Sequence, residues 1–347
     1  MAHRWGRAPL QNSPVVQVGT VEYYPATLCS DSKRTKRYLA EYRRSFLLTQ
    51  VRTLVPYREH RMGLHSSANV STVVWRRFPG RSPDKPACQR FLQVNSPLFH
   101  RPSLFTAAIH LLYLTEFALR LFHTSDWHLG QNLHGQERDF EHACFLDWLL
   151  GQLKAEQPDA LLIAGDIFDT VNPPLKAQER LYDFIISAHE QNPKLTIVMI
   201  AGNHDSGSRI ELPAPLMRRL RTHALGRVLW LDDGQLDAER LLIPLPDAKG
   251  KIAAWCLALP FLRPAEVTGA HLGDDYLRGI GQVHEWLIAA ANAKRKKGQA
   301  LIAISHAHMA GGSVSEDSER SLIIGNAEAL PASLFDASVS YVALGHL

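Results

Sequence analysis

The sequence predicts an α/β layered fold for residues 119–347. Short apolar runs alternate there with amphipathic helical stretches, which is the pattern of strands packed against helices. The run at 160–165 is apolar on both faces, as a fully buried strand requires. Five such runs end in Asp, Asn or His, at the strand ends where open α/β sheets place their ligand sites.

Strands and helices are expected in a regular order along this region. We expect strands at 119–124, 160–165, 195–202, 301–308 and 340–347. We expect helices at 138–157, where apolar residues recur at helical spacing before a proline, and at 175–191, 212–225 and 276–296. Strand-like segments joined by Asp- and Gly-containing turns are expected at 227–231, 240–246 and 251–261.

Residues 1–118 differ from the rest of the chain in charge and in pattern. Of the 38 Lys and Arg and the 34 Asp and Glu residues, 17 and 6 lie in 1–118, which leaves 21 and 28 in 119–347. Apart from a helix-capable stretch at 111–121, no period of 2 or 3.6 is sustained there. One interpretation is a basic arm that contacts nucleic acid phosphates. The other is a poorly structured or disordered leader, or upstream sequence translated from a misassigned start.

The composition is that of a soluble globular protein, with 46% apolar and 21% charged residues. The best candidate for a membrane span, at 103–118, is interrupted by His110 and Glu116. The first 14 residues lack the apolar core of a secretory signal. The cysteines form no CxxC pair, so buried or free thiols of a cytoplasmic protein are expected, in preference to a disulfide framework, at Cys29, Cys88, Cys144 and Cys256.

The five strand ends carry the chemistry. In chain order they deliver Asp126 and His128, then Asp166, then Asn203, His204 and Asp205, then His306 and His308, and finally His346. Each could by itself be a turn, a cap or a core histidine, but five coincidences at equivalent edges indicate a site. Asp and His at positions i and i+2 can point to one side of an extended segment. A mixed nitrogen and oxygen ligand set without thiolate suits Mn²⁺, Fe or Zn²⁺. Two such ions clamp a phosphate and activate water, which is the chemistry of phosphoester hydrolysis.

The ordered motifs D-x-H, GD, GNHD, a strand-end His and a last GH resemble those of the calcineurin-like metallophosphoesterase superfamily, over 119–347. The sequence segments at 123–142, 164–174, 201–206 and 311–320 are similar to those of the SbcD nucleases. These are the nuclease subunits of bacterial SbcC–SbcD complexes and relatives of the Mre-eleven repair nuclease. The resemblance implies a sandwich of two β-sheets flanked by helices in four α/β/β/α layers. It also implies two Mn²⁺ ions held by Asp126, His128, Asp166, Asn203, His306 and His346.

The resemblance gives roles to single residues as well. Asp166 would bridge the two ions, and His204 would steady the scissile phosphate and protonate the leaving oxygen, a role that the pKa of histidine suits. Asp205 would orient His204 or cap the following turn. Arg138 and Arg209 could meet phosphate, although surface charge is the alternative for each.

Three departures from the family pattern are visible. Asp169 stands where some relatives have a second catalytic histidine. His306 and His308 compete for one ligand position, and His306 is favoured because it directly follows a strand. The final GHxH motif of the family stops here at Leu347, so we expect a C-terminally truncated domain with an incomplete metal shell. A His appended after Leu347 would complete this shell, and tighter binding of Mn²⁺ would reveal the effect. The cap domain and the helices that dock the partner ATPase would also be missing.

Leu119 occupies the position of the first methionine in SbcD-like proteins, so translation is expected to begin there, and a native peptide from 1–118 would refute this.

The implied function is a Mn²⁺-dependent DNA nuclease of repair and recombination, exonucleolytic on double strands and endonucleolytic on hairpins or single strands. Two alternatives stay open: a phosphoesterase acting on a small phosphodiester or phosphoprotein, and an inactive remnant kept as a folded or dimerising module. For the latter, the helix at 138–157 could supply a dimer face through Phe145, Trp148 and Leu149, or simply face the core.

Overall fold

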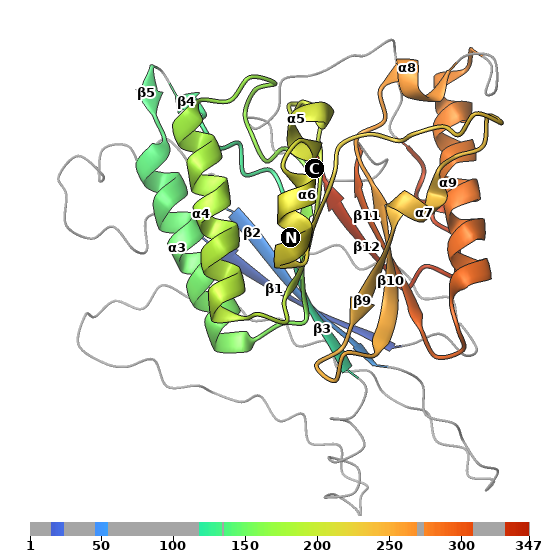
Figure 1. The fold of residues 1–347 in the computed structure, drawn as a ribbon, viewed down its shortest axis with the longest axis horizontal. Helices are drawn as coiled ribbons and strands as arrows, with labels where there is room; N and C mark the ends of the chain where they lie inside the picture. Colours follow the sequence, from blue (N-terminus) through green and yellow to red (C-terminus); the bar gives the residue numbers. More distant parts are fainter. Residues whose placement is uncertain are drawn as a thin grey trace, which may run out of the picture.

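The computed structural model describes residues 15–23, 46–54, 118–133, 135–268, 274–307 and 330–346. Two β-sheets pack face to face, with helices on the outer side of each (Figure 1). The layers therefore run α/β/β/α, and the fold class predicted from the sequence is confirmed. Among the described residues, no helix is both long and apolar enough to cross a membrane.

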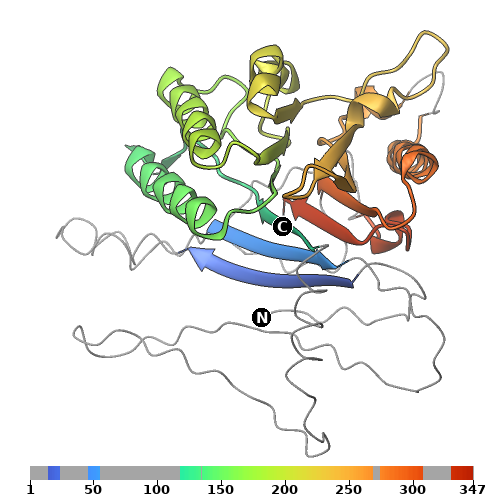
Figure 2. The same cartoon turned by 60° about the horizontal axis from the view of Figure 1, so that its bottom comes forward.

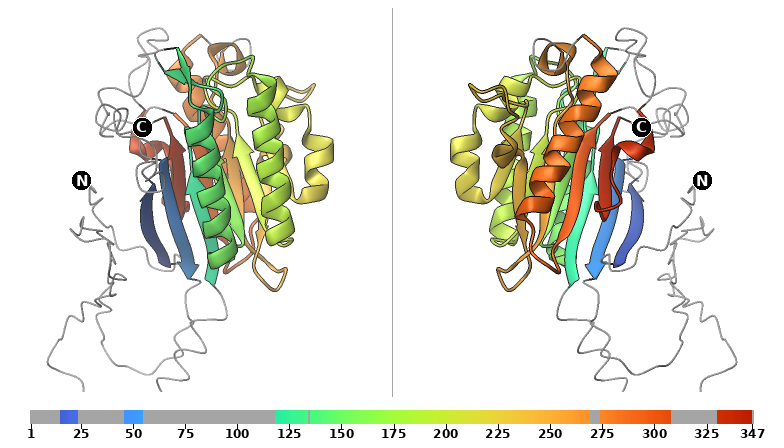
Figure 3. Two further views of the ribbon diagram at one scale, coloured as in Figure 1. Left: turned by 90° about the vertical axis from the view of Figure 1, so that its left-hand side faces the viewer. Right: turned by 90° about the vertical axis from the view of Figure 1, so that its right-hand side faces the viewer.

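The first sheet has six strands, of which the last four are parallel to one another. Their spatial order is β1 (Val15–Tyr23), β2 (Phe46–Leu54), β3 (Ala118–Thr124), β6 (Ala160–Ala164), β7 (Thr196–Ile200) and β8 (Thr222–Leu225). β1 and β2 pair antiparallel with each other, and β2 pairs antiparallel with β3, so they extend the sheet at one edge (Figures 2 and 3).

The second sheet has four strands, three of which, β10, β11 and β12, are parallel to one another. Their order is β12 (Tyr341–Gly345), β11 (Ala300–His306), β10 (Ile252–Leu259) and β9 (Leu242–Pro246), the last antiparallel to β10. A short hairpin of β4 (Asn132–Leu133) and β5 (Gln136–Glu137) stands apart from both sheets.

Long helices cover the two outer faces. The first sheet is covered by α3 (Asp139–Glu156) and α4 (Leu175–Gln191), and the second by α9 (Tyr276–Lys294) (Figure 1). α3 ends where Gln157 adopts a left-handed conformation directly before Pro158, which agrees with the stop signal in the sequence. The short elements are α5 (Gly207–Glu211), α6 (Ala214–Met217), η2 (Arg218–Leu220), α7 (Ala238–Leu241), α8 (Pro264–Val267) and η3 (Ala332–Leu334).

The strands of the first sheet feed two separate cores because their side chains alternate between faces. In β6, Leu161 and Ile163 join Phe145 of α3 in the core beneath α3 and α4. Leu162 of the same strand faces the second sheet and joins the larger core that continues to Val283 of α9. Both faces of the sheet are thus buried, which explains the unbroken apolar runs in the sequence.

Several local predictions need correction. The helix expected at 212–225 is broken. α6 ends at Met217 and η2 at Leu220, Arg221 follows with a left-handed φ of 50°, and β8 then pairs with β7. The segment 227–231 is not a strand, since Trp230 forms only an isolated bridge to Leu236. The start of the 240–246 segment is the end of α7 rather than a strand.

The N-terminal part brings a further difference. β1 and β2 are strands in a region whose sequence pattern predicts no ordered strand, and Ala118–Thr124 is a strand where the stretch at 111–121 looked helix-capable. The remainder of residues 1–117 lies outside the described residues. The division of the chain at 118/119 therefore stays a prediction, with β2 and β3 joined across it.

Buried histidines should make the fold acid-sensitive. Burial in the core lowers the pKa of His284 from 6.5 to about 4, against its hydrogen bond to the Ile280 carbonyl, which raises it. Between these two values the unfolded chain binds more protons than the folded one, so stability falls as the pH drops from 6.5 toward 4. One such group contributes a slope of at most about 1.4 kcal/mol per pH unit. Urea unfolding across this range should show a smaller slope for His284→Gln, and equal slopes would contradict the assignment.

Candidate metal centre

The polar residues predicted at the strand ends come together at one edge of the sandwich. They follow β3, β6 and β7 of the first sheet and β11 and β12 of the second, and main-chain hydrogen bonds connect their loops. The N–H of Asp126 donates to the Gly165 carbonyl (3.0 Å), and that of His128 to the Asp166 carbonyl (2.9 Å). Across the two sheets, the N–H of His346 points at the Asp126 carboxylate, 3.3 and 3.4 Å from its two oxygens.

The backbone at these strand ends is held in an uncommon conformation. Six described residues other than glycine have a left-handed φ, and four of them are predicted ligands: Asp126 (57°), His128 (48°), Asp166 (48°) and His346 (65°). Such a conformation costs on the order of 1 kcal/mol or more per residue and persists where the surroundings enforce it, commonly at functional sites. Between two of them, Trp127 turns into the core under α3 and α4, which lets its neighbours face the site.

Glycines precede the site residues because there is no room for a side chain. A Cβ at Gly165 would lie 2.3 Å from Nδ1 of His306, and one at Gly202 would lie 2.1 Å from the Asp166 carboxylate. At Gly345 it would lie 1.9 Å from the Ala164 carbonyl oxygen. The glycines of the GD, GN and GH pairs, Gly165, Gly202 and Gly345, are therefore positions where neighbouring loops pack in close contact.

Asp166 belongs to two overlapping groups of ligand atoms. His128, Asp166 and His204 form one group, Asp166, His306 and His346 form the other, and within each group the ligand atoms lie within 4.8 Å of one another. The Asp166 side chain is fully buried, and its Oδ2 lies 3.3 Å from Nε2 of His306 and 3.9 Å from Nε2 of His128. Burial would raise the pKa of Asp166, but His306, His128 and the main-chain N–H of His204 hold it well below its ordinary value.

His306 supplies a positive charge to the buried carboxylate. Its Nδ1–H donates to the Ala164 carbonyl (2.8 Å), and its Nε2–H donates to Oδ1 of Asn203 (2.8 Å). Burial disfavours the imidazolium, yet the Asp166 carboxylate outweighs this and raises the pKa of His306 to about 9. A metal ion bound at Nε2 would replace that proton while the bond to Ala164 stayed in place, so ion binding should release a proton.

The residue types and their placement fit divalent ions. The two groups offer carboxylate and imidazole donors with Asp166 shared between them, the Asn203 amide oxygen lies beside His306, and none of these residues is a thiolate. The Nε2 atom of His204 is buried and has no hydrogen-bond partner among the described residues, while its Nδ1–H donates to the Asp169 carbonyl (2.9 Å). An imidazole fixed in this way presents a lone pair toward the ion site. His308 lies outside the described residues.

Sequence comparison supplies the family. The calcineurin-like phosphoesterase profile matches residues 119–347. The chain belongs to this family. It is 43% identical over 234 residues to the SbcD subunit of the nuclease SbcCD from Rhodobacter capsulatus, 37% over 235 residues to that of Bacillus subtilis, and 34% over 240 residues to that of Escherichia coli. Each match covers 66% of this chain and 58%, 56% and 56% of the relative, so the chain spans little more than half the length of these proteins.

Asp205 of the phosphoesterase GNHD motif has a role that the sequence did not predict. Its buried carboxylate accepts three main-chain N–H groups, from Ile167 (3.1 Å), Phe168 (2.9 Å) and Gly202 (2.9 Å). Asp205 therefore connects the loop after β6, which begins with Gly165 and Asp166, to the loop after β7, and it does not orient the His204 ring. Burial, with the nearby Asp166 charge, raises the pKa of Asp205 to about 6 against these hydrogen bonds.

The two arginines that flank the phosphoesterase motifs differ in placement. Arg138, the N-cap residue of α3, is buried, and its guanidinium donates to Oε1 of Gln131 (2.9 Å) in the loop between β3 and β4, so it is not a surface charge. Arg209 is exposed on α5. Among the residues considered for a dimer face, Phe145 and Leu149 are fully buried in the core and Trp148 is half-buried, which favours the core interpretation for the first two.

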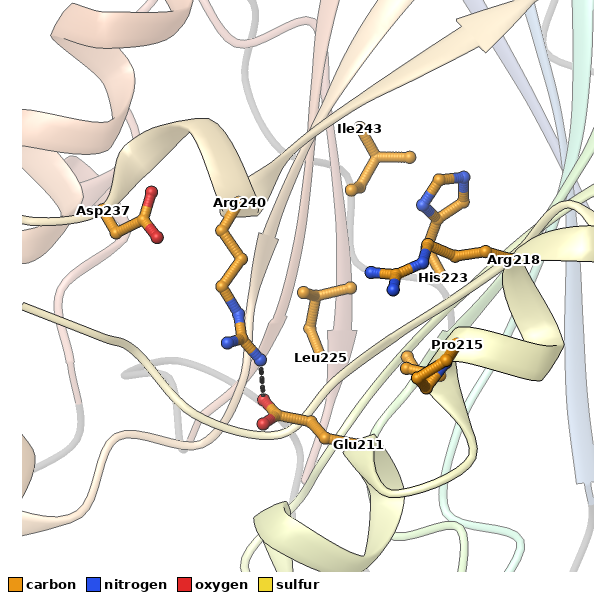
Figure 4. Close-up of a pocket in the computed structure, with 10 residues that line it drawn as sticks. Glu211, Pro215, Arg218, His223, Leu225, Asp237, Arg240 and Ile243 are labelled. Carbon is orange, nitrogen blue, oxygen red and sulfur yellow. Dashed lines mark ion pairs between the residues drawn. The ribbon is translucent and has the colours of Figure 1, made fainter.

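A separate cavity of about 490 Å³ opens where β8 and β9, the outer strands of the two sheets, approach α5 and α6 (Figure 4). An ion pair between Arg240 and Glu211 closes one side of it. None of the predicted ligands at the strand ends lines this cavity. Its lining consists of Glu211, Ala214, Pro215, Arg218, His223, Ala224, Leu225, Asp237, Arg240 and Ile243.

Proposed function

We propose that residues 119–347 form the catalytic domain of a DNA nuclease of the SbcCD type, acting in DNA repair and recombination. The observation that carries the proposal is the pair of ligand groups that share the buried Asp166 at the strand ends of a calcineurin-like phosphoesterase. The similarity to three SbcD nucleases supports DNA as the substrate, since the net acidic balance of 119–347 does not by itself indicate it.

In this proposal two Mn²⁺ ions are held by Asp126, His128, Asp166, Asn203, His306 and His346. Bound divalent ions would supply Lewis-acid activation of the phosphodiester and of a water molecule. The chain contributes the buried Asp166 carboxylate, which is shared by the two groups, and imidazoles fixed by main-chain carbonyls, so little reorganisation would accompany the reaction. In its protonated form the His204 imidazole would donate the Nε2 proton to the leaving oxygen, with the ring held through Nδ1 by the Asp169 carbonyl.

The finer assignments belong to the proposal as well. We expect exonuclease activity on double strands and endonuclease activity on hairpins or single strands, in the cytoplasm and together with an SbcC-type ATPase, with a homodimer as a further possibility to be tested by sedimentation. The alternative phosphoesterase substrate is a small phosphodiester.

The test is Mn²⁺-dependent cleavage of an end-labelled DNA duplex, a hairpin and a small phosphodiester such as bis(p-nitrophenyl) phosphate. We expect the duplex and the hairpin to be cleaved with Mn²⁺ and not with excess EDTA. Cleavage of the small phosphodiester alone would favour the alternative function, and tight Mn²⁺ binding without cleavage of any substrate would favour an inactive domain.

Substitution of His204 should separate catalysis from ion binding. His204→Gln removes the proton donor, so we expect the cleavage rate to fall by about 10²- to 10⁴-fold, the usual contribution of a positioned acid. Mn²⁺ affinity, measured by calorimetry, should change far less. A loss of affinity as large as the loss of rate would instead make His204 an ion ligand, which its place beside His128 and Asp166 also permits. His189→Gln, in the last turn of α4 at the opposite end of the sheet, is the matched control.

A further inference from the structure

Asp169 contacts both histidines of one ligand group. Its Oδ1 lies 3.5 Å from Nδ1 of His128, and its main-chain carbonyl accepts the Nδ1–H of His204. The two imidazole rings stand edge to face, with centroids 4.9 Å apart and planes at 87°. One residue thus meets the rear nitrogen of each ring.

The position of Asp169 is itself fixed by main-chain bonds. Its N–H donates to the Leu129 carbonyl (3.2 Å), one residue beyond His128, and Leu129 forms a parallel bridge with Phe168. The GD loop and the D-x-H loop therefore run side by side at this point. The carboxylate is only about a quarter exposed, and it faces His128 from a backbone that cannot easily shift.

An imidazole can carry its single proton on either nitrogen, and only the other nitrogen can bind a metal ion. A carboxylate next to Nδ1 favours the Nδ1–H form and leaves the lone pair on Nε2. In His128 this Nε2 lies on the side of Asp166, 3.9 Å from its Oδ2. His128 thus lies between Asp169 on its Nδ1 side and Asp166 on its Nε2 side. In metal sites an outer carboxylate placed in this way orients the histidine that binds the ion.

We propose that Asp169 is a positioning residue, whose carboxylate fixes the tautomer and ring orientation of His128 so that Nε2 serves the ion site on that side of Asp166. The inference rests on the proposed metal-dependent function. It also makes the two ion sites unequal. The rear nitrogen of His306, in the other group, meets the neutral carbonyl of Ala164 rather than a carboxylate.

The inequality gives the test. In a two-step calorimetric titration with Mn²⁺, Asp169→Ala should weaken one binding step by about 10- to 100-fold, the usual effect of removing an outer partner of a ligand, and leave the other step unchanged. Asp169→Asn keeps an oxygen acceptor without the charge and should fall between the wild type and Asp169→Ala. Because His204 is held by the main-chain carbonyl, neither substitution removes its hydrogen bond. Asp232→Asn, an exposed change of equal charge in a surface loop, should leave both steps unchanged.

A second measurement works without any metal. The ¹⁵N shifts of the His128 imidazole in the metal-free protein report which nitrogen carries the proton. We expect the Nδ1–H form in the wild type and a shift toward the Nε2–H form in Asp169→Ala. Equal tautomer populations in the two proteins, or equal loss of both Mn²⁺ steps, would overturn the proposal. If the wild type bound no Mn²⁺, the proposed function would fail, while the tautomer measurement would still decide the role of Asp169.

Discussion

Asp166→Asn is expected to abolish DNA cleavage and to remove both Mn²⁺ binding steps at once. Asp166 is the residue common to the two ligand groups, and its carboxylate is buried without access to bulk water. A neutral amide of the same size cannot serve two cations. We therefore expect a loss of cleavage rate well above the roughly 10- to 100-fold that removal of an outer partner causes.

The same substitution should change the metal-free protein in a way that can be measured. Burial lowers the pKa of His306, and the Asp166 carboxylate is the largest of the influences that nevertheless raise it to about 9. Without that charge, only Asp126 and the hydrogen bond to Ala164 oppose burial, so the pKa of His306 should fall. An NMR titration of His306 would follow this shift independently of activity.

Asp232→Asn is the matched control for Asp166→Asn, because it removes the same charge from an exposed loop. It should keep both cleavage and the His306 titration. Retention of one Mn²⁺ step in Asp166→Asn would contradict a bridging role. An unchanged His306 pKa would contradict the charge pairing described above.

The sequence was sufficient to predict that these polar residues gather at the strand ends, because residue type and strand position coincide there. Buried parallel strands are recognisable from unbroken apolar runs such as 160–165, and their carboxyl ends meet at one edge. The side chain of Trp127 does turn into the core between Asp126 and His128, but the left-handed φ of these two residues, rather than the extended alternation expected from the sequence, produces this arrangement. Which atoms touch could not be derived in this way.

The contacts of Asp169 and Asp205 depend on how two loops lie against each other. Both residues follow strand ends, as the proposed ligands do, yet Asp205 binds main-chain N–H groups and Asp169 faces a histidine. From the sequence alone, an aspartate at a strand end that would bind a metal ion cannot be distinguished from one that accepts main-chain N–H groups or one that contacts a histidine. Only one of the three N–H groups that Asp205 accepts, that of Gly202, lies in its own loop, so the GNHD pattern alone could not reveal its contacts with Ile167 and Phe168.

The short strand β8 was missed for a different reason. Its residues Thr222–Leu225 follow a stretch with good helix formers, and four residues are too few to show an alternating pattern. Pairing with β7 and burial of Ala224 decided the conformation, which is a tertiary effect that local propensity does not contain. For β1 and β2 the same holds, since the antiparallel pairing of β1 with β2 and of β2 with β3 is a long-range feature.

Gly165→Ala should disrupt the fold and the metal centre together. The residue has a left-handed φ of 84°, and an added Cβ would lie 2.3 Å from Nδ1, 2.6 Å from Cγ and 2.9 Å from Cβ of His306. The ring cannot move away freely, because its two nitrogens are bonded to Ala164 and Asn203. Backbone strain of about 1–2 kcal/mol and overpacking of about 1–3 kcal/mol give an expected loss of about 2–5 kcal/mol in the free energy of unfolding.

Gly250→Ala separates these two causes, because Gly250 has nearly the same φ, 81°, with nothing within 4 Å of the added Cβ. Urea unfolding should give a loss of only about 1–2 kcal/mol for Gly250→Ala, from the backbone alone. Mn²⁺ affinity should fall in Gly165→Ala and stay constant in Gly250→Ala, since only the former displaces His306. Equal losses of stability in the two variants would mean that the His306 ring yields to the new methyl group. In that case the glycine of the GD pair would be required for its backbone conformation and not for close packing.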